Sequence, residues 1–239
     1  MFMSTKEDEI AAANTIPDDL PDVVDDFGKK PDDIAVQERE EFKKKVERRV
    51  KDYQIKVLNE PRKGKKLLVL DIDYTLFDHR SVGEKGVELR PYLHEFLTEV
   101  YDHYDIIIWS ATDMKWIEVK MQELGVAHNN NYNITFYLDS CAMVSVVAPE
   151  YGFVETKALG VIWDKYPDHY NEENTIIFDD LRRNFLMNPQ NGLKVRPFKN
   201  AHTSRYSDGE LVKLSKYLTA IAKLDTFKHL DHDKWEQYS

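Results

Sequence analysis

The chain has 239 residues, of which 42% are hydrophobic, and a formal net charge of −10. This length allows one complete α/β core with short appendages. No apolar run approaches the length of a membrane span, and the first ten residues lack the plan of a signal peptide. The single cysteine, Cys141, excludes an internal disulfide, and we expect it to be buried.

The first 41 residues are acidic, with four basic and 13 acidic side chains. Segments of this composition bury too little apolar surface to fold alone, so we expect residues 1–41 to be a disordered tail or linker. A partner-docking peptide around residues 20–24 is the alternative. The rest of the chain is nearly neutral, with 29 basic and 30 acidic residues. It offers no broad basic face for direct binding of nucleic acid.

Residues 42–60 lead into the core. Their large apolar side chains recur at spacings of four, four and three: Phe42, Val46, Val50 and Tyr53. This spacing predicts an amphipathic helix packed on the domain that follows, over residues 61–239. The basic run 62–66 is either a nuclear localisation signal or the entrance to the first core strand.

Strands and helices alternate beyond this point. Apolar runs predict buried strands at residues 67–70, 104–109 and 174–178. Helices are predicted at Pro91, after Thr112 or Asp113, and after a capping box of Ser207 and Glu210. The alternation is typical of an α/β fold with a central parallel sheet flanked by helices. Between the second and third strands, residues 133–156 predict a small antiparallel β insertion.

Polar residues follow these predicted strands. Asp71 and Asp73 come after the first, Ser110 after the second, Lys157 after the insertion, and Asp179-Asp180 after the third. Parallel strands bind ligands at their carboxyl ends, so these residues belong to one cleft. Side chains alternate along an extended chain, so Asp71 and Asp73 project to the same side. Paired carboxylates suit a divalent cation, or a nucleophile with an acid–base partner.

Phosphoryl transfer to a carboxylate fits this set of residues. Each pair of negative charges in such a reaction costs about 4 kcal/mol at 4 Å and an effective dielectric of 20. The site must therefore supply positive charge, which Mg²⁺ and Lys157 can provide, while Ser110 donates a hydrogen bond to a phosphoryl oxygen.

The order Asp-x-Asp-x-Thr, Ser, Lys and Asp-Asp resembles the haloacid-dehalogenase superfamily of aspartate-based phosphatases. The stretches Val69–Leu76 and Arg90–Leu97 are similar to the Fcp/Scp phosphatases, which act on the C-terminal domain (CTD) of RNA polymerase II. Further stretches resemble the CTD phosphatases that carry a ubiquitin-like domain: 77–81, 109–112, 178–180 and 184–194. The resemblance covers roughly residues 45–239 and leaves out the ubiquitin-like domain itself. It implies a Rossmann-like haloacid-dehalogenase fold and an Fcp/Scp-type phosphatase domain.

The resemblance also implies catalytic roles. Asp71 would be the nucleophile that forms an aspartyl-phosphate, and Asp73 would protonate the leaving oxygen and then activate water. Thr75 would fix the turn that carries both acids and line the substrate site. Ser110 and Lys157 would hold the transferring phosphoryl group.

The same resemblance implies a Mg²⁺ cofactor. Its ligands would be Asp71, the backbone carbonyl of Asp73, and Asp180, with Asp179 either ligating through water or orienting Lys157. The substrate-binding residues would include Ala111 and Asn184, besides Thr75, Ser110 and Lys157. Clustered carboxylates raise the proton affinity of Asp73, which predicts activity biased toward acidic pH.

The implied function is that of a monomeric nuclear phosphatase for phosphoserine or phosphothreonine in proteins. The candidate partners are the regulatory particle of the proteasome and the CTD of RNA polymerase II. Residues 138–141 lack the Arg that small CTD phosphatases carry, which argues against the same phosphosite preference. A small-metabolite phosphatase and a regulator that tethers a partner are the alternatives. The short flap at about 77–90 leaves the cleft open and favours a protein substrate.

Overall fold

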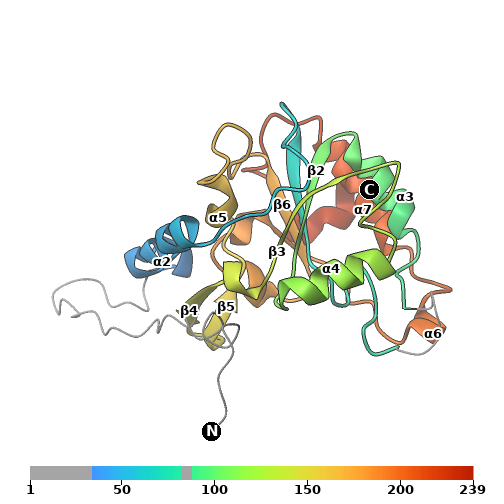
Figure 1. Ribbon diagram of the computed structural model, residues 1–239, viewed down its shortest axis with the longest axis horizontal. Helices are drawn as coiled ribbons and strands as arrows, with labels where there is room; N and C mark the ends of the chain where they lie inside the picture. Colours follow the sequence, from blue (N-terminus) through green and yellow to red (C-terminus); the bar gives the residue numbers. More distant parts are fainter. Residues whose placement is uncertain (1–33, 82–87, 239) are drawn as a thin grey trace, which may run out of the picture. The chain divides into compact units, whose positions relative to one another are not determined.

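The computed structural model describes residues 34–81 and 88–238. Its centre is a five-stranded sheet with the strand order β3-β2-β1-β6-β7, in which all pairs are parallel (Figure 1). The strands are β1 (Lys66–Leu70), β2 (Tyr104–Trp109), β3 (Ile134–Leu138), β6 (Thr175–Asp179) and β7 (Gly192–Lys194). The predicted α/β class, with a central parallel sheet flanked by helices, is confirmed.

Both faces of β1 are apolar, which suits the central position in a covered sheet. Leu68 and Leu70 join one hydrophobic cluster, whereas Leu67 and Val69 join another. The first cluster is covered by α3 (Leu93–Tyr101), α4 (Met114–Glu123) and α7 (Glu210–Ile221). The second is covered by α2 (Glu40–Asp52), α5 (Gly160–Trp163) and the hairpin of β4 (Val144–Ala148) and β5 (Gly152–Thr156). Figure 1 shows these two groups on opposite sides of the sheet.

Short helices complete the described part of the chain. They are η2 (Val36–Glu38), η3 (Ser140–Ala142), η4 (Arg182–Phe185), η5 (Pro189–Asn191), α6 (Ala201–Ser204) and η6 (His232–Tyr238). Within the described ranges, every helix is too short or too polar to cross a membrane.

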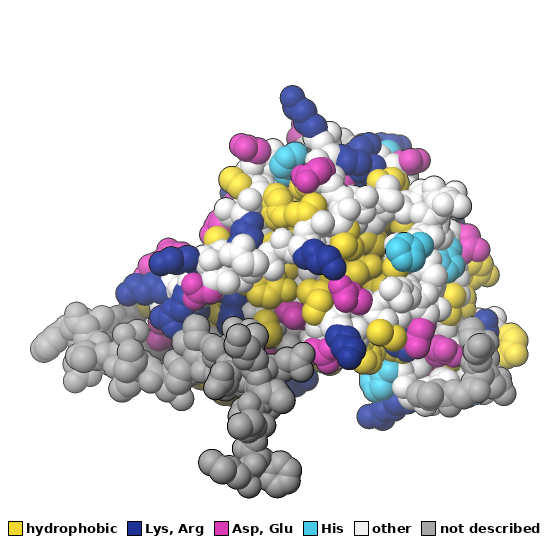
Figure 2. All heavy atoms as spheres, viewed as in Figure 1, with side chains coloured by type: hydrophobic (Ala, Val, Ile, Leu, Met, Phe, Trp, Pro, Cys, Tyr) yellow, Lys and Arg dark blue, Asp and Glu magenta, His cyan; other side chains and the backbone are white. Residues whose placement is uncertain are grey.

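The predicted amphipathic helix is present as α2, which buries Phe42 and Val46 against the second cluster. Lys and Arg side chains gather over this helix on the face shown in Figure 2. The helix ends at Asp52, so residues 53–60 of the predicted segment are not helical. In the basic run 62–66, Arg62 pairs with Asp105 at 2.7 Å, and Lys66 donates to the carbonyl of Leu224 at 2.7 Å. This run is therefore held in the fold as the entrance to β1.

Two predicted boundaries are wrong. Residues 34–41 were predicted as tail but contain η2 and the start of α2, because Val36 packs on the second cluster and Arg39 is buried. The rest of the predicted tail, with its alternative docking peptide, lies outside the described residues. The antiparallel insertion is confined to residues 144–156, because residues 134–138 are buried on both faces and pair with β2 as a strand of the main sheet.

Smaller local predictions have mixed outcomes. Asp113 caps α4 by accepting a hydrogen bond from the Trp116 amide at 3.0 Å, as one of the two predicted alternatives. Pro91 lies two residues before α3 rather than at its first position. The capping box of Ser207 and Glu210 does not form, because α7 begins at Glu210 itself. Cys141 is exposed rather than buried.

Candidate active site

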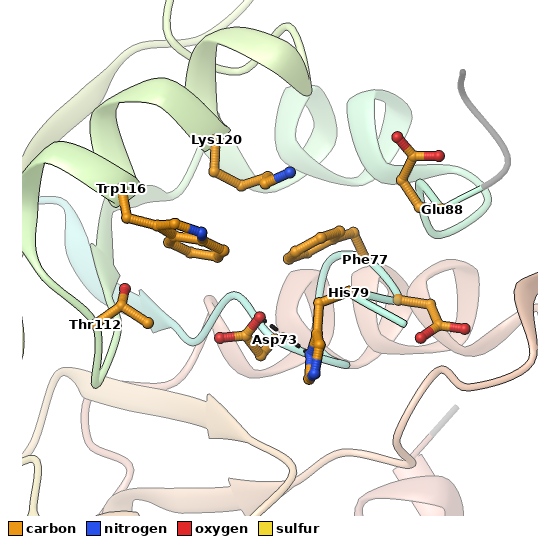
Figure 3. Close-up of a pocket in the computed structure, with 8 residues that line it drawn as sticks. Asp73, Phe77, His79, Glu88, Thr112, Trp116 and Lys120 are labelled. Carbon is orange, nitrogen blue, oxygen red and sulfur yellow. Dashed lines mark ion pairs between the residues drawn. The ribbon is translucent and has the colours of Figure 1, made fainter. Parts of the chain in front are cut away.

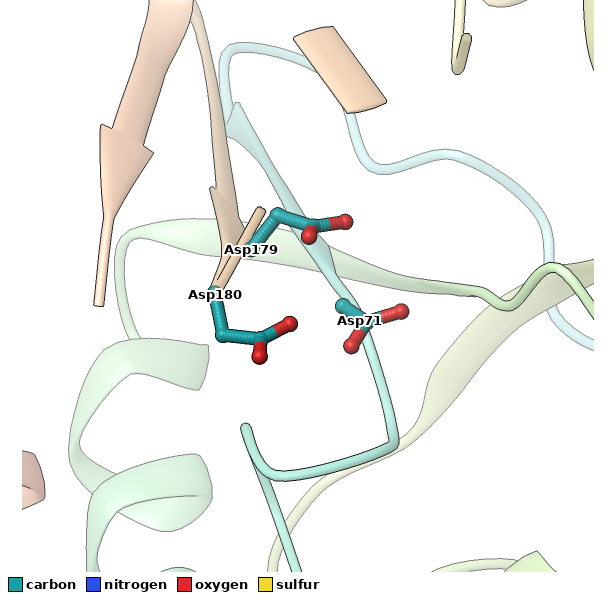
Figure 4. Close-up of side chains that lie close together, drawn as sticks. All are labelled: Asp71, Asp179 and Asp180. Atoms are coloured by element: carbon teal, nitrogen blue, oxygen red, sulfur yellow. The ribbon is translucent and has the colours of Figure 1, made fainter. Parts of the chain in front are cut away.

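Three carboxylates meet where β1 and β6 end. Asp71 directly follows β1, and Asp179 ends β6, its neighbour in the sheet, with Asp180 next in the chain. One carboxylate oxygen from each residue lies within 4.8 Å of the others, and all three residues are buried. Figure 4 shows the side chains of Asp71, Asp179 and Asp180 close together at the two strand ends. The predicted convergence of the first and third strand ends is therefore present in the structure.

Lys157 connects two of these acids. Its ammonium donates to Asp71 Oδ1 at 2.5 Å and to Asp179 Oδ2 at 2.7 Å, and its side chain is fully buried. Asn184 contacts both Lys157 and Asp179. Its carbonyl accepts a hydrogen bond from the Lys157 backbone amide at 2.6 Å, and its side-chain amide donates to both oxygens of Asp179 at 2.9 Å. Asp179 therefore accepts a hydrogen bond from Lys157, and both of its predicted roles, orienting Lys157 and ligating Mg²⁺ through water, stay predictions. The substrate-binding role of Asn184 stays a prediction.

The cluster holds more negative than positive charge. Three carboxylates surround one ammonium, and burying charge without compensation is costly. Burial raises the pKa of Asp71, and Asp179 raises it further, although Lys157 opposes both. Burial and the neighbouring Asp179 also raise the pKa of Asp180. Burial alone would lower the pKa of Lys157, but the carboxylates of Asp179 and Asp71 raise it, so the ammonium remains charged.

A strained turn carries the acids. Tyr74 has a φ of 59°, in the left-handed region that residues other than glycine rarely adopt. The amide of Phe198 donates to the Tyr74 carbonyl at 2.8 Å, and Leu76 closes the turn onto Ile72 at 2.9 Å. The hydroxyl of Thr75 reaches Asp71 Oδ2 at 3.3 Å. Such strain persists only where surrounding contacts over-determine the conformation, as they do here.

Asp73 has a different environment from Asp71. Its Oδ1 lies 3.4 Å from Nδ1 of His79, whose ring is tilted against that of Tyr74 with the two centroids 4.5 Å apart. Burial raises the pKa of Asp73, opposed by His79, Lys157 and Lys120. Its carboxylate is outside the group of three whose oxygens could hold a metal ion. It faces a cavity of about 420 Å³ instead (Figure 3).

The walls of this cavity contain residues that the sequence reasoning missed. Phe77 and Trp116 lie with their ring centroids 6.1 Å apart, and the Lys120 ammonium lies 4.8 Å from the Phe77 ring. Trp116 and Lys120 are four residues apart on α4, so they share one face of the helix. The sequence signal that could have indicated these residues is the aromatic side chain and the lysine four positions apart, shortly after Ser110.

Ser110 and Ala111 lie at the end of β2. Ser110 is buried, and among the described residues its hydroxyl has a hydrogen bond with Thr112 at 3.0 Å. Ala111 is exposed. The residues are placed at the predicted edge of the sheet, and their phosphate-binding roles stay predictions.

Comparison with known proteins identifies the family. The model of the NLI interacting factor-like phosphatases matches residues 66–228. The chain belongs to this phosphatase family. Ubiquitin-like domain-containing CTD phosphatase 1 from Rattus norvegicus, Homo sapiens and Danio rerio is in each case 59% identical over all 239 residues. The chain covers 75% of the length of each of these phosphatases, and the family resemblance seen in the sequence motifs is confirmed.

Proposed function

We propose that this phosphatase is a Mg²⁺-dependent protein serine/threonine phosphatase that works through an aspartyl-phosphate on Asp71. The observation that carries the proposal is the buried cluster in which Lys157 contacts both Asp71 and Asp179. The ammonium of Lys157 fixes one oxygen of Asp71 and leaves the other free to attack, and a bound divalent cation would favour the ionised form of this carboxylate, whose pKa burial raises. The high identity to CTD phosphatases supports a phosphoprotein substrate.

The residues divide the reaction between them. Asp71 attacks phosphorus through Oδ2, the oxygen not held by Lys157, while Asp73 gives its proton to the leaving serine oxygen. Asp73 then takes a proton from the water that attacks the aspartyl-phosphate, which releases inorganic phosphate and restores both acids. Lys157 and Ser110 stabilise the charge on the transferring oxygens. The raised pKa of Asp73 keeps its acid form available for the first step.

The donor set fits Mg²⁺. Carboxylate oxygens are the ligands this ion prefers, and a divalent cation balances the excess of two negative charges left by three carboxylates and one ammonium. Asp71 and Asp180 would ligate the ion directly, with the backbone carbonyl of Asp73. When bound, the ion would neutralise charge on the phosphoryl group.

The candidate substrates are phosphoserine sites in the proteasome regulatory particle and in the CTD of RNA polymerase II, and the proposed compartment is the nucleus. Family resemblance supports these assignments. The CTD also stands in the names of the relatives, which are called CTD phosphatases. The cavity beside Asp73 gives a peptide residue next to the phosphoserine room to enter.

The test is phosphate release from a panel of phosphoserine peptides, including CTD repeats and proteasomal ATPase sequences, with Mg²⁺ or with EDTA. We expect Mg²⁺-dependent release that Asp71→Asn lowers at least about 10⁴-fold, as expected for loss of a nucleophile. Asp168→Asn, which changes an exposed carboxylate, is the matched control. Turnover of a sugar phosphate but of no peptide would favour the small-metabolite phosphatase. Absence of any turnover in a folded protein would favour the tethering regulator.

A further inference from the structure

Two lysines border the cleft from opposite edges of the sheet. Lys120 lies on α4, which follows β2 and packs on the β3 side, whereas Lys199 lies five residues beyond β7, at the other edge. The amide of Phe198, next to Lys199, donates to the Tyr74 carbonyl at 2.8 Å, which brings this segment back to the catalytic turn. The lysines therefore lie on either side of the acids at the end of β1.

Each lysine rests on an aromatic ring of the cleft. The Lys199 ammonium is 4.6 Å from the centroid of Tyr74, and the Lys120 ammonium is 4.8 Å from that of Phe77 and 5.8 Å from that of Trp116. Figure 3 shows Lys120 beside the cavity that Asp73 and Phe77 also line. An aromatic face attracts a cation without cancelling its charge. It also restricts the side chain before any ligand arrives, which lowers the entropy lost on binding.

The two lysines differ in how much charge they present. Lys120 is 2.7 Å from Glu123, which partly neutralises it. Lys199 is exposed, and the ion pairs of the described residues include none that it makes. Burial raises the pKa of Asp73 and of Asp180, and the charges of Lys120 and Lys199 oppose these shifts at Asp73 and Asp180 respectively. Lys157, by contrast, already forms ion pairs with two carboxylates inside the cluster.

We propose that Lys120 and Lys199 make this phosphatase selective for phosphoserine peptides that carry further negative charge on residues flanking the phosphoserine. The inference rests on the proposed protein phosphatase function and defines its substrate class. The flanking charge would come from Asp, Glu or a second phosphoserine. An extended peptide advances about 3.3–3.6 Å per residue, so the residues that flank a phosphoserine held at Asp71 extend away from it toward the two borders of the cleft.

The experiment compares kcat/KM for three kinds of peptide built on one sequence. The first has neutral flanks, the second has one Glu moved through the three positions on each side, and the third has a second phosphoserine at the best of these positions. The enzymes are wild type, Lys199→Met, Lys120→Met, Lys199→Arg, and Lys216→Met as an exposed control on α7.

We expect wild type to prefer the charged peptides, and Lys199→Met to lower the charged-to-neutral ratio by about two- to fivefold, the range of an exposed ion pair. Lys120→Met should lower it less, because Glu123 competes for that charge. Lys199→Arg and Lys216→Met should keep the ratio, and raising the salt concentration should shrink it in wild type. A response to Glu and phosphoserine alike would show that carboxylates suffice, whereas a response to phosphoserine alone would assign the site to phosphate.

A wild-type ratio of one, or a ratio that Lys199→Met leaves unchanged, would overturn the inference. In that case, Asp71-dependent release from the neutral peptide would still support the proposed function. Failure to release phosphate from every peptide of the three kinds would overturn both.

Discussion

Lys157 and Arg90 are both fully buried cations, yet their surroundings differ. Arg90 forms a bidentate pair with Asp208, at 3.1 and 3.0 Å, and donates to the carbonyls of Thr75 and Arg196 at 3.1 and 2.9 Å. Its single charge meets a single carboxylate, and its remaining donors meet neutral oxygens. Lys157 meets two carboxylates, with Asp180 as a third nearby.

This difference separates a structural ion pair from a chemical site. A buried pair with balanced charge and satisfied donors is closed to further ligands. A buried cluster with excess negative charge favours the arrival of protons or cations, and perturbed groups of this kind concentrate at functional sites. We therefore assign Arg90 to the positioning of the catalytic turn through the Thr75 carbonyl, and Lys157 to the chemistry.

Replacing Lys157 is the strongest test of this contrast. Lys157→Met keeps the length of the stem but removes the ammonium, so we expect about a 10²–10³-fold loss of rate on a phosphopeptide. The fold should survive, because the carboxylates can take up protons when the cation is gone. Steady-state kinetics with circular dichroism would check both, with Lys216→Met as the control. A loss below threefold would contradict the assigned role.

Replacing Arg90 should act on stability instead. Arg90→Met leaves Asp208 and two carbonyls without their partner, and we expect a loss of about 2–3 kcal/mol in the free energy of unfolding. This lies below the usual cost of about 3–5 kcal/mol for breaking a buried pair, since the Asp208 side chain is 12% exposed and can be hydrated.

Urea unfolding would measure this loss. Arg196→Met is the control, because that side chain is 68% exposed and should change stability by less than about 1 kcal/mol. Equal losses for the two variants would show that the buried pair of Arg90 adds no more stability than an exposed one, and would contradict its structural assignment.

The contrast also explains what the sequence could predict. Asp71 directly follows β1 and Asp179 ends β6, and parallel strands present their carboxyl ends at one edge, so their meeting was predictable. Lys157 follows β5 of the antiparallel hairpin, so its place in the site was predicted from the order of the motifs and the family resemblance. The class of the fold followed from the alternating apolar runs. Arg90 was visible in the sequence only as part of a family motif, because its partner Asp208 is 118 residues away and joins it through tertiary packing alone.

Other predictions failed because of partners distant in the sequence. The short β-strand signal of residues 134–138 fits an insertion hairpin as well as a strand of the main sheet, and pairing with β2 decides between them. Glu210 looked like the acid of a capping box, but in the fold it accepts a hydrogen bond from the backbone amide of Arg196 at 3.1 Å. In both cases a long-range partner overrode a local signal.

The pH dependence of the rate gives a smaller test of the excess negative charge in the cluster. A raised pKa keeps Asp73 protonated to a higher pH than an ordinary aspartate, and its proton is needed by the leaving oxygen. We therefore expect kcat to be highest on the acidic side of neutrality. Above the pKa of Asp73, kcat should fall by up to about tenfold for each pH unit. A pH–rate profile would check this, and Asp73→Asn should remove the descending limb. An optimum above pH 8 would argue against Asp73 as the acid.

Replacing Asp180 with Asn removes one negative charge and keeps the shape of the side chain, so it tests directly whether the cluster holds excess negative charge. In EDTA at neutral pH, Asp180→Asn removes a negative charge from a cluster with too many, so we expect the variant to be more stable by about 0.5–2 kcal/mol. Because burial and Asp179 raise the folded-state pKa of Asp180, its ionised form costs stability as the pH rises through that pKa. The stability advantage of Asp180→Asn should therefore disappear as the pH falls toward the pKa of an unfolded aspartate.

Mg²⁺ should reverse the ranking of the two proteins, since an ion bound to the folded state stabilises wild type more than a variant that lacks a ligand. Urea unfolding at several pH values, with and without Mg²⁺, would measure the difference in the free energy of unfolding between variant and wild type. Asp168→Asn should show none of these effects. If Asp180→Asn is the less stable protein in EDTA at pH 8, the cluster is balanced as it stands, and the contrast with Arg90 fails.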